Sequence, residues 1–365
     1  MIHLIPTEAK RFRTFGWVQD PSDFRSLCDV VAIFDETSLK HQELAGQVIP
    51  ALVEERDGRQ RLLDALNQRP LRISYTDLVG TSFTPRSAAR CNGIVQAAVR
   101  GQVRPFIGDW PADNFVRWAH ALGFLRYGYQ GDAFELTEAG KALAQARTQG
   151  EELNSQEKEL LTSAVLAYPP AVRILSLLGE GEGAHLTKFE LGKQLGFVGE
   201  DGFTSLPQTV LVRSLASSKD AKEKNKMKTD WDGSSDKYAR MIAKWLEKLG
   251  LVKQEAKPVT VTLAGRKYTE SIGQSYVITG LGITALNRTL GKSRHKRTPK
   301  NVSFEMMATK GDDREYLRTR RTCVLKAVSE GKGRVSYTEI QKYLEALGLQ
   351  EDEATIRDDV QGLIH

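Results

Sequence analysis

Apolar residues recur at helical spacing in two segments of the chain, and each segment ends at a glycine. The first segment ends at Gly123, and its apolar positions are Phe115, Trp118, Ala119 and Leu122. The second ends at Gly250, and its apolar positions are Tyr238, Ile242, Trp245, Leu246 and Leu249. This spacing predicts an amphipathic helix in each segment, with the glycine as its C-terminal stop.

The same order of elements follows each predicted helix. In the first segment we expect a short strand at 124–125, a turn at 130–132, a strand at 133–136 and a new helix from Thr137. In the second we expect a strand at 251–253, a polar loop, a strand at 276–278 and a helix from Thr279. A shorter helix precedes each unit, at 75–78 and at 186–196, the latter with Thr187 as a plausible cap. Helix, glycine stop, hairpin and helix is the layout of a winged helix, whose second helix enters the major groove of DNA.

A third, incomplete copy closes the sequence. A helix is predicted from Tyr337 to Gly348, followed by another from Asp352 to about Leu363, whose core face is Ile356, Val360 and Leu363. The exposed face of the last helix is expected to be acidic, because Glu351, Asp352, Glu353, Asp358 and Asp359 are crowded together. The chain stops where the hairpin of this copy would begin. We therefore expect a truncated unit that faces protein rather than nucleic acid.

These patterns define the expected fold class, which is mainly α with small β wings (α+β). Three tandem helix-turn-helix or winged-helix subdomains are predicted, over 1–146, 147–287 and 288–365. A length of 365 residues suits two or three domains. No run of 18 apolar residues occurs, so no membrane partner is expected. The three cysteines lie far apart, which disfavours a disulfide framework or a zinc cage and fits a cytoplasmic location.

Positive charge is concentrated in particular windows. The net charge is +6, but residues 78–108 and 271–304 contain no acid, and a lysine ladder occupies Lys219, Lys222, Lys224, Lys226 and Lys228. Any one of these clusters could be solvated surface. Several clusters together favour a surface that faces phosphates. Winged helices also serve as protein-interaction modules, so DNA binding does not follow from the fold pattern alone.

Several residues have the chemistry that reads bases. Lys237 suits guanine and Asp232 suits cytosine N4, although a cap at Ser235 with a solvated Lys237 explains the same residues. Arg86 could contact guanine or a phosphate, and Ser87 can donate to phosphate. Trp110 is either a core aromatic or a side chain on a thymine methyl group.

Motifs of known enzymes are sparse. The chain lacks HExxH, Walker, GxSxG and CxxC motifs. The triplet Glu255-Ala256-Lys257 is similar to the acid-x-Lys triplet of metal-dependent nucleases, but several such triplets are expected by chance in a chain rich in Glu and Lys. No cofactor or metal is therefore expected in this chain.

Longer strings of sequence carry a family resemblance. They are RTFGWVQ (13–19), FVRWAHALGF (115–124), YPPAVRIL (168–175), HLTKFELGKQLGF (185–197), GFTSLP (202–207), GSSDKYARMI (233–242) and KLGLVKQ (248–254). In this order, from about Lys10 to His365, the chain resembles the recognition portion of FokI-like type IIS restriction endonucleases. The resemblance implies three helix-turn-helix subdomains and recognition of an asymmetric GGATG-like site in double-stranded DNA.

The resemblance also implies the contact residues. The expected base contacts are Gln19, Asp20, Arg86, Trp110, Thr229, Asp232 and Lys237. The expected backbone contacts are Arg13, Ser87, Arg90, Lys228, Ser234 and Ser235. Asp20 and Thr229 stand where the family has asparagine, which removes two amides suited to adenine, whereas Asp232 replaces a glutamate and keeps the carboxylate.

The resemblance further implies a parent enzyme with a separate Mg²⁺-dependent nuclease domain that this chain lacks. The third subdomain would contact that domain, and the recognition module would bind DNA as a monomer, inactive alone. Two alternatives remain at this point. One is a stand-alone winged-helix transcription regulator, and the other is a complete enzyme with a cryptic site around Glu255 and Lys257.

Overall fold

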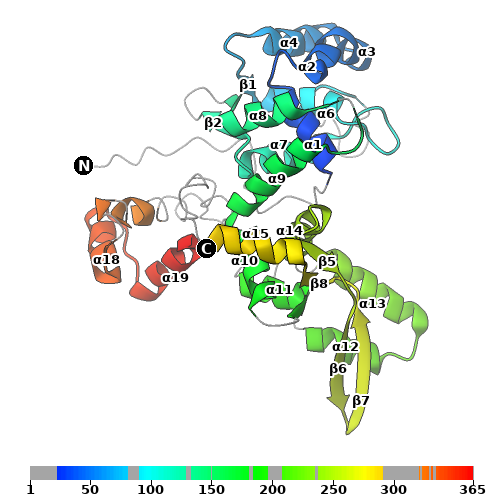
Figure 1. The fold of residues 1–365 in the computed structure, drawn as a ribbon, viewed down its shortest axis with the longest axis vertical. Helices are drawn as coiled ribbons and strands as arrows, with labels where there is room; N and C mark the ends of the chain where they lie inside the picture. Colours follow the sequence, from blue (N-terminus) through cyan, green and yellow to red (C-terminus); the bar gives the residue numbers. More distant parts are fainter. Residues whose placement is uncertain are drawn as a thin grey trace. The chain divides into compact units, whose positions relative to one another are not determined.

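A computed structural model describes residues 23–80, 90–128, 133–148, 150–180, 184–195, 208–234, 237–290, 320, 323–328, 330–331 and 334–364. Helices predominate and the sheets are small and antiparallel, which confirms the predicted α+β class (Figure 1). The chain divides into two compact units, residues 8–168 and residues 169–365 together with 1–7. Within the described ranges, no single helix is long and apolar enough to cross a membrane, whereas residues 155–167 and 170–179 reach that length and apolar composition together as a bent pair.

The unit formed by residues 8–168 begins with helices and then contains the first predicted repeat. Its described elements are α1 (Phe24–Ala32), α2 (Leu39–Glu43), η2 (Leu44–Val48), α3 (Ile49–Leu52), α4 (Arg56–Asn67), β1 (Ile73–Ser74), α5 (Tyr75–Val79), α6 (Ile94–Ala98), α7 (Asp109–Ala121), β2 (Leu125–Gly128), β3 (Ala133–Leu136), α8 (Glu138–Ala146) and α9 (Ser155–Ala167). The strands form a sheet in the order β1-β3-β2. Trp118 of α7 is fully buried and packs against Phe24 of α1.

The unit that starts at residue 169 contains the second repeat and the described helices of the third copy. Its described elements are α10 (Pro169–Gly179), β4 (His185–Thr187), α11 (Lys188–Leu195), α12 (Gln208–Ser217), α13 (Ala221–Ser234), α14 (Lys237–Lys248), β5 (Val252–Gln254), β6 (Lys257–Leu263), β7 (Arg266–Ile272), β8 (Ser275–Ile278), α15 (Gly280–Leu290), α18 (Tyr337–Ala346) and α19 (Glu353–Ile364). The sheet order β4-β8-β5 reproduces that of the first repeat. The predicted sequence of helix, strand, strand and helix is present in both copies.

The glycine stops are the same backbone motif in all three copies. Gly123, Gly250 and Gly348 have φ of 78°, 73° and 81°, a region that side chains beyond glycine rarely adopt. The residue after each glycine donates its backbone N–H to the carbonyl oxygen five residues earlier. These hydrogen bonds are Phe124 N–H to Ala119 O at 2.9 Å, Leu251 N–H to Leu246 O at 2.8 Å, and Leu349 N–H to Leu344 O at 3.0 Å. This is the Schellman pattern of helix termination. The three glycines therefore direct the chain out of each helix in the same way.

A threonine and a glycine join the hairpin to the helix that follows it. Thr137 donates its hydroxyl to Gly123 O at 2.7 Å and caps Gly140 N–H at 3.0 Å. Thr279 donates to Gly250 O at 2.7 Å and caps Gly282 N–H at 3.0 Å. A Cβ on Gly140 or Gly282 would lie 2.1 or 2.0 Å from a backbone carbonyl oxygen of the preceding turn. The two repeats therefore share the same hydrogen bonds and the same close glycine contact at this junction.

Capping residues also begin the first helix of each copy. The N–H of Asp77, Glu190 and Glu339 is accepted by the hydroxyl of Ser74, Thr187 and Ser336 at 3.0, 3.2 and 3.2 Å. The carboxylates of Glu190 and Glu339 in turn accept the backbone N–H of Thr187 and Ser336, which completes a capping box in each case. The predicted cap at Thr187 is thus confirmed.

The predicted polar loop between 253 and 276 is wrong, because most of it forms a long hairpin. Strands β6 and β7 pair in register from Lys257 with Ile272 to Leu263 with Arg266. Val259, Val261 and Ile272 pack on Leu211, Val212 and Leu215 of α12 and on Phe189 of α11. The alternation of Val259 and Val261 with polar residues was a strand signal, and Ala264-Gly265 supplies the turn with φ of 47° and 76°.

Residues 229–234 form the last turns of α13. One further expectation is corrected by the helices. The acidic face of the last helix is partly internal, because the Asp359 side chain is buried and accepts from Arg320 Nε at 2.7 Å. Arg320 also binds Glu351 at 3.2 Å. Ile356 is buried as predicted.

Candidate nucleic-acid interface

Helix α7 presents one end to the surface. Residues 112–121 are buried throughout, whereas Asp109, Trp110 and Pro111 in its first turn are half-buried. The helix begins at Asp109, so Trp110 belongs to the helix itself. Residues at the N-terminal end of a recognition helix are those that contact base edges. Trp110 is therefore placed where a base contact from this helix would arise.

The buried part of α7 contains an ion pair. Arg117 donates to both carboxylate oxygens of Asp113, at 3.1 and 2.8 Å, and also to Asn114 Oδ1 at 2.9 Å. The Tyr75 hydroxyl of α5 donates to Asp113 at 3.0 Å. Because a buried charge needs such partners, this network fixes α5 against α7. Helices α5 and α7 are thus held in one relative orientation.

The second unit places its candidate residues at the junction of α13 and α14. Thr229 and Asp232 lie in the last turns of α13, Ser234 ends that helix and Lys237 begins α14. The Thr229 side chain is exposed and its hydroxyl donates to Asn225 O at 2.9 Å. The side chains of Asp232, Ser234 and Lys237 lie outside the described part of the structure, as does Ser235. The backbone nevertheless brings these positions to the N-terminal end of α14, the counterpart of α7.

Lys228 has a partner within the protein. Its amine lies 2.9 Å from a carboxylate oxygen of Glu270 on β7, and the side chain remains 44% exposed. The ion pair joins α13 to strand β7 of the β6–β7 hairpin. An ammonium has three N–H donors, so Lys228 keeps donor capacity for a phosphate while it holds Glu270.

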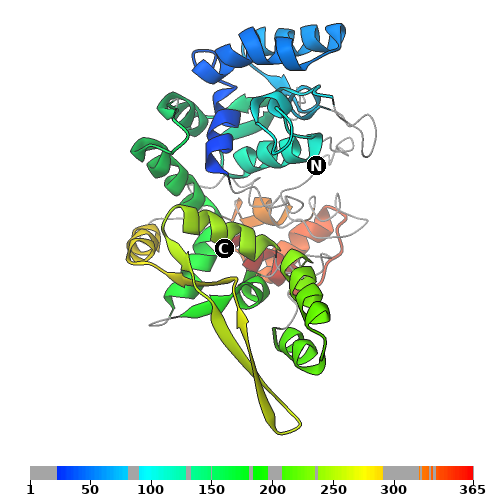
Figure 2. The ribbon, with the colours of Figure 1, turned by 90° about the vertical axis from the view of Figure 1, so that its right-hand side faces the viewer.

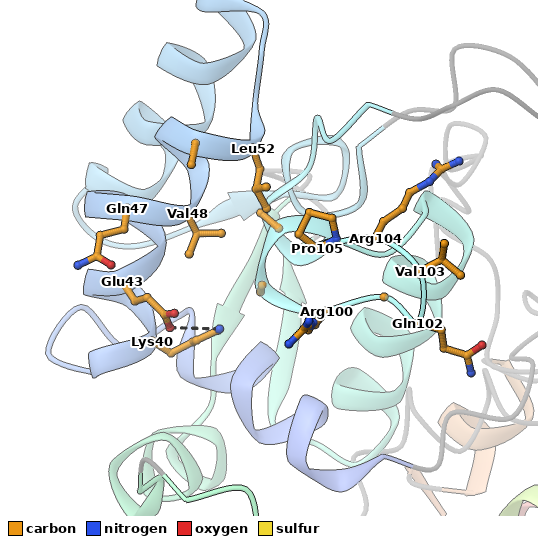
Figure 3. A pocket seen from close by; sticks show the side chains of 14 residues that line it. Lys40, Glu43, Gln47, Val48, Leu52, Arg100, Gln102, Val103, Arg104 and Pro105 are labelled. Atoms are coloured by element: carbon orange, nitrogen blue, oxygen red, sulfur yellow. Dashed lines mark hydrogen bonds and ion pairs between the residues drawn. The ribbon is translucent and has the colours of Figure 1, made fainter.

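The remaining candidates differ in what the structure describes. Arg90 is exposed, whereas Arg13, Gln19, Asp20, Arg86 and Ser87 lie outside the described residues. Two cations of the same acid-free window, Arg100 and Arg104, are exposed and line a pocket of about 550 Å³ with Lys40. In Figure 3, Lys40 pairs with Glu43 on one side of this pocket, and Arg100 and Arg104 come from the loop that follows α6.

Three features bear on possible enzyme chemistry among the described residues: two cysteine thiols, the Glu255-Ala256-Lys257 triplet and clusters of metal-ligand side chains. Burial raises the pKa of the Cys28 thiol to about 12 and that of Cys91 to about 11, so neither thiol is an activated nucleophile. Glu255 pairs with Lys253 at 2.8 Å, whereas Lys257 pairs with Glu190 at 2.8 Å. The two ends of the nuclease-like triplet therefore serve separate ion pairs. Among the described residues, no group of three His, Cys, Asp or Glu side chains could hold a metal ion.

Comparison with protein families defines the class of this chain. A model described as FokI, recognition domain, subdomain 1 matches residues 13–146, and one described as subdomain 2 matches residues 157–294. A third, described as the FokI D3 domain, matches residues 307–365. The three models follow one another along the sequence in the order of the repeats described above. The chain belongs to the FokI recognition-domain family.

Individual relatives agree with this assignment. The chain is 44% identical to type II restriction enzyme FokI of Planomicrobium okeanokoites, over 97% of this chain and 60% of the relative. It is 34% identical to type II restriction enzyme StsI of Streptococcus sanguinis, over 87% of this chain and 53% of the relative. The solved structure of FokI bound to DNA matches with a TM-score of 0.83 and 43% identity, over 97% of this chain and 60% of that one. The chain thus spans about three-fifths of the length of FokI.

Proposed function

We propose that this chain binds double-stranded DNA at a short asymmetric GGATG-like site, as the recognition module of a type IIS restriction endonuclease. The observation that carries the proposal is the placement of Trp110 and Lys237. Each lies in the first turn of the equivalent helix, α7 or α14, in two copies of the same unit. The match to FokI recognition subdomains, and to the structure of FokI bound to DNA, supports it. The comparisons give no support to a stand-alone transcription regulator.

Base reading would be divided between the two units. Lys237 would bind guanine and Asp232 the amino group of cytosine, with Trp110 against a thymine methyl group. Gln19, Asp20, Arg86 and Thr229 complete the proposed base contacts. Arg13, Ser87, Arg90, Lys228, Ser234 and Ser235 would bind the DNA backbone, which positions the protein without selecting sequence.

The test compares binding to site-bearing and single-base-changed duplexes by fluorescence anisotropy. Lys237→Ala is expected to cost about 1–3 kcal/mol of binding free energy, concentrated at one guanine. Lys248→Ala is the matched control, because Lys248 is exposed at the opposite end of α14. Unchanged discrimination by Lys237→Ala would refute its role. Equal affinity of the unaltered protein for all duplexes would refute the proposed function itself.

The parent enzyme is a further part of the proposal. We propose that cleavage belongs to a Mg²⁺-dependent nuclease domain outside these 365 residues, and that this chain itself holds no cofactor. The division into 1–146, 147–287 and 288–365 gives the third part the role of contacting that domain. The module would bind DNA as a monomer in the cytoplasm. Incubation with Mg²⁺ and site-bearing DNA should leave both strands intact, and cleavage by this chain would contradict the assignment.

A further inference from the structure

The β6–β7 hairpin has two faces of different character. Along each strand alternate side chains point to opposite faces, so Val259, Val261, Tyr268 and Ile272 face the core formed with α11, α12 and α13. Glu270, the carboxylate of this hairpin, faces the same side, because it pairs with Val259 in the register and binds Lys228 of α13. The inner face thus contains both the apolar residues and the negative charge.

The outer face is rich in hydroxyl groups and lacks acids. Its cross-strand pairs are Pro258 with Ser271, Thr260 with Thr269, and Thr262 with Lys267. All six side chains are exposed. The hydroxyls of Thr260 and Thr269 lie 2.7 Å apart and bond to each other. Lys267 is the cation of this face. Figures 1 and 2 both show the hairpin tip extending past α12 and α13, which line its inner side.

Hydroxyls and a single cation without carboxylates match the chemistry of a phosphodiester chain. Ser and Thr hydroxyls, together with Lys and Arg, provide many of the protein contacts to DNA phosphate oxygens. A hydroxyl donates to such an oxygen without the desolvation cost of a charge. The ion pair of Lys228 with Glu270 joins the hairpin to α13, the helix that carries Thr229 and Asp232. The outer face therefore belongs to the same unit as the candidate base readers.

We propose that the outer face of the β6–β7 hairpin, with Thr262 and Lys267 nearest its tip, binds the sugar-phosphate backbone of the DNA duplex beside the recognised site. This inference rests on the proposed function and extends it to a surface that contributes affinity rather than base selection. The hairpin core would hold the outer face rigid, because its inner residues pack on α12.

The test uses Thr262→Val with Lys267→Gln, which removes the hydroxyl and the charge but keeps β-branched or long side chains. The matched control is Thr284→Val with Lys248→Gln, two exposed positions of the same unit outside the hairpin. We expect the hairpin variant to lose affinity for site-bearing and for scrambled duplexes by the same factor. That factor should be about fivefold, the effect of one lost hydrogen bond. The slope of log affinity against log salt should fall by about 0.9 for one lost phosphate contact. The control should match the unaltered protein in both measurements.

Three results would overturn the proposal. Unchanged affinity and salt slope in the hairpin variant would mean that the face does not touch DNA. Lost discrimination at unchanged affinity for scrambled duplex would mean that it reads bases instead. A concentration-dependent dimer of the unaltered protein in sedimentation, abolished in the hairpin variant, would mean that the face binds a second copy. Binding to scrambled DNA measures the backbone contact by itself. If the unaltered protein failed to discriminate between sequences, the proposed function would be refuted, and the hairpin contact would still be judged from the scrambled duplex.

Discussion

Helices α7 and α14 occupy equivalent places in the two repeats, yet their polar positions differ. When Gly123 is aligned with Gly250, Trp118 falls on Trp245, and both indoles are fully buried. Asp113 and Arg117 fall on Arg240 and Lys244, so a buried ion pair in one copy is replaced by two cations in the other. The comparison teaches that the fold depends on the apolar face and the terminating glycine. The polar positions have diverged with the surroundings of each copy.

Breaking the Asp113–Arg117 ion pair of α7 is expected to have the largest effect on the free energy of unfolding. Asp113→Ala should lower the free energy of unfolding by about 3–5 kcal/mol, because Arg117 would stay buried without its carboxylate. The control is Lys244→Ala in α14, at the position equivalent to Arg117, which should change stability by no more than about 0.5 kcal/mol, since Lys244 is half-buried. Urea unfolding, with hydrogen exchange of α7 and α14 to separate the units, measures both. A loss below about 1 kcal/mol in Asp113→Ala would mean that the network adds little to the first unit.

The second-largest expected loss of stability comes from the junction between the hairpin and the following helix, which the two repeats share. Gly282→Ala should destabilise the second unit by about 2–3 kcal/mol, because the new Cβ would meet Leu251 O at 2.0 Å. Gly140→Ala should cost the first unit a similar amount, since its Cβ would lie 2.1 Å from Phe124 O. Gly280→Ala, where nothing lies within 4 Å of the added carbon, is the control. Thermal unfolding of the three variants checks this, and different losses at Gly140 and Gly282 would show that the junctions are not energetically equivalent.

The smallest effect concerns the acid at the start of α11. Burial opposes ionisation of Glu190, but hydrogen bonds from Lys257, the Thr187 N–H and Gln208 outweigh it and hold its pKa below the ordinary value. The resulting stability is present above the unfolded pKa of about 4.3 and is lost as the pH falls through the lower folded pKa.

Glu190→Gln should therefore cost about 1 kcal/mol at pH 7, a modest value because the pair is partly exposed. The difference from the unaltered protein should disappear in acid. Urea titrations between pH 7 and pH 3 measure it, with Glu345→Gln at an exposed position as the control. A difference that persisted at the acid end would assign the effect to packing rather than to charge.

Local pattern was sufficient for the repeat but not for the insertion. The helices at α7 and α14, their glycine stops and the short strands follow from apolar spacing and from the conformational freedom of glycine. The β6–β7 hairpin was missed because Thr, Lys and Ser dominate its outer face and made the segment resemble a loop. Its apolar positions form a core with α12, which lies about fifty residues earlier, so the strand signal is completed by a distant element.

The candidate site divides in the same way. The residue types at Trp110, Asp232 and Lys237 indicated base-reading chemistry, and the family resemblance indicated their roles. Burial of residues 112–121 could not be predicted from helical spacing, because charged Asp113 and Arg117 read as a solvent-facing side until they are seen to pair. The internal position of Asp359 was hidden for the same reason, since its partner Arg320 is 39 residues away.

By itself, the sequence determined the tandem order of helices and the points at which they end. Glycine conformation, capping and apolar periodicity act within a few residues, so they are legible along the chain. Tertiary structure alone decided which charges are internal and which faces are open. Lys228 with Glu270, Lys257 with Glu190 and Arg320 with Asp359 are pairings over long separations. Such pairings depend on how the elements pack, and that packing leaves the hydroxyl face of the hairpin exposed.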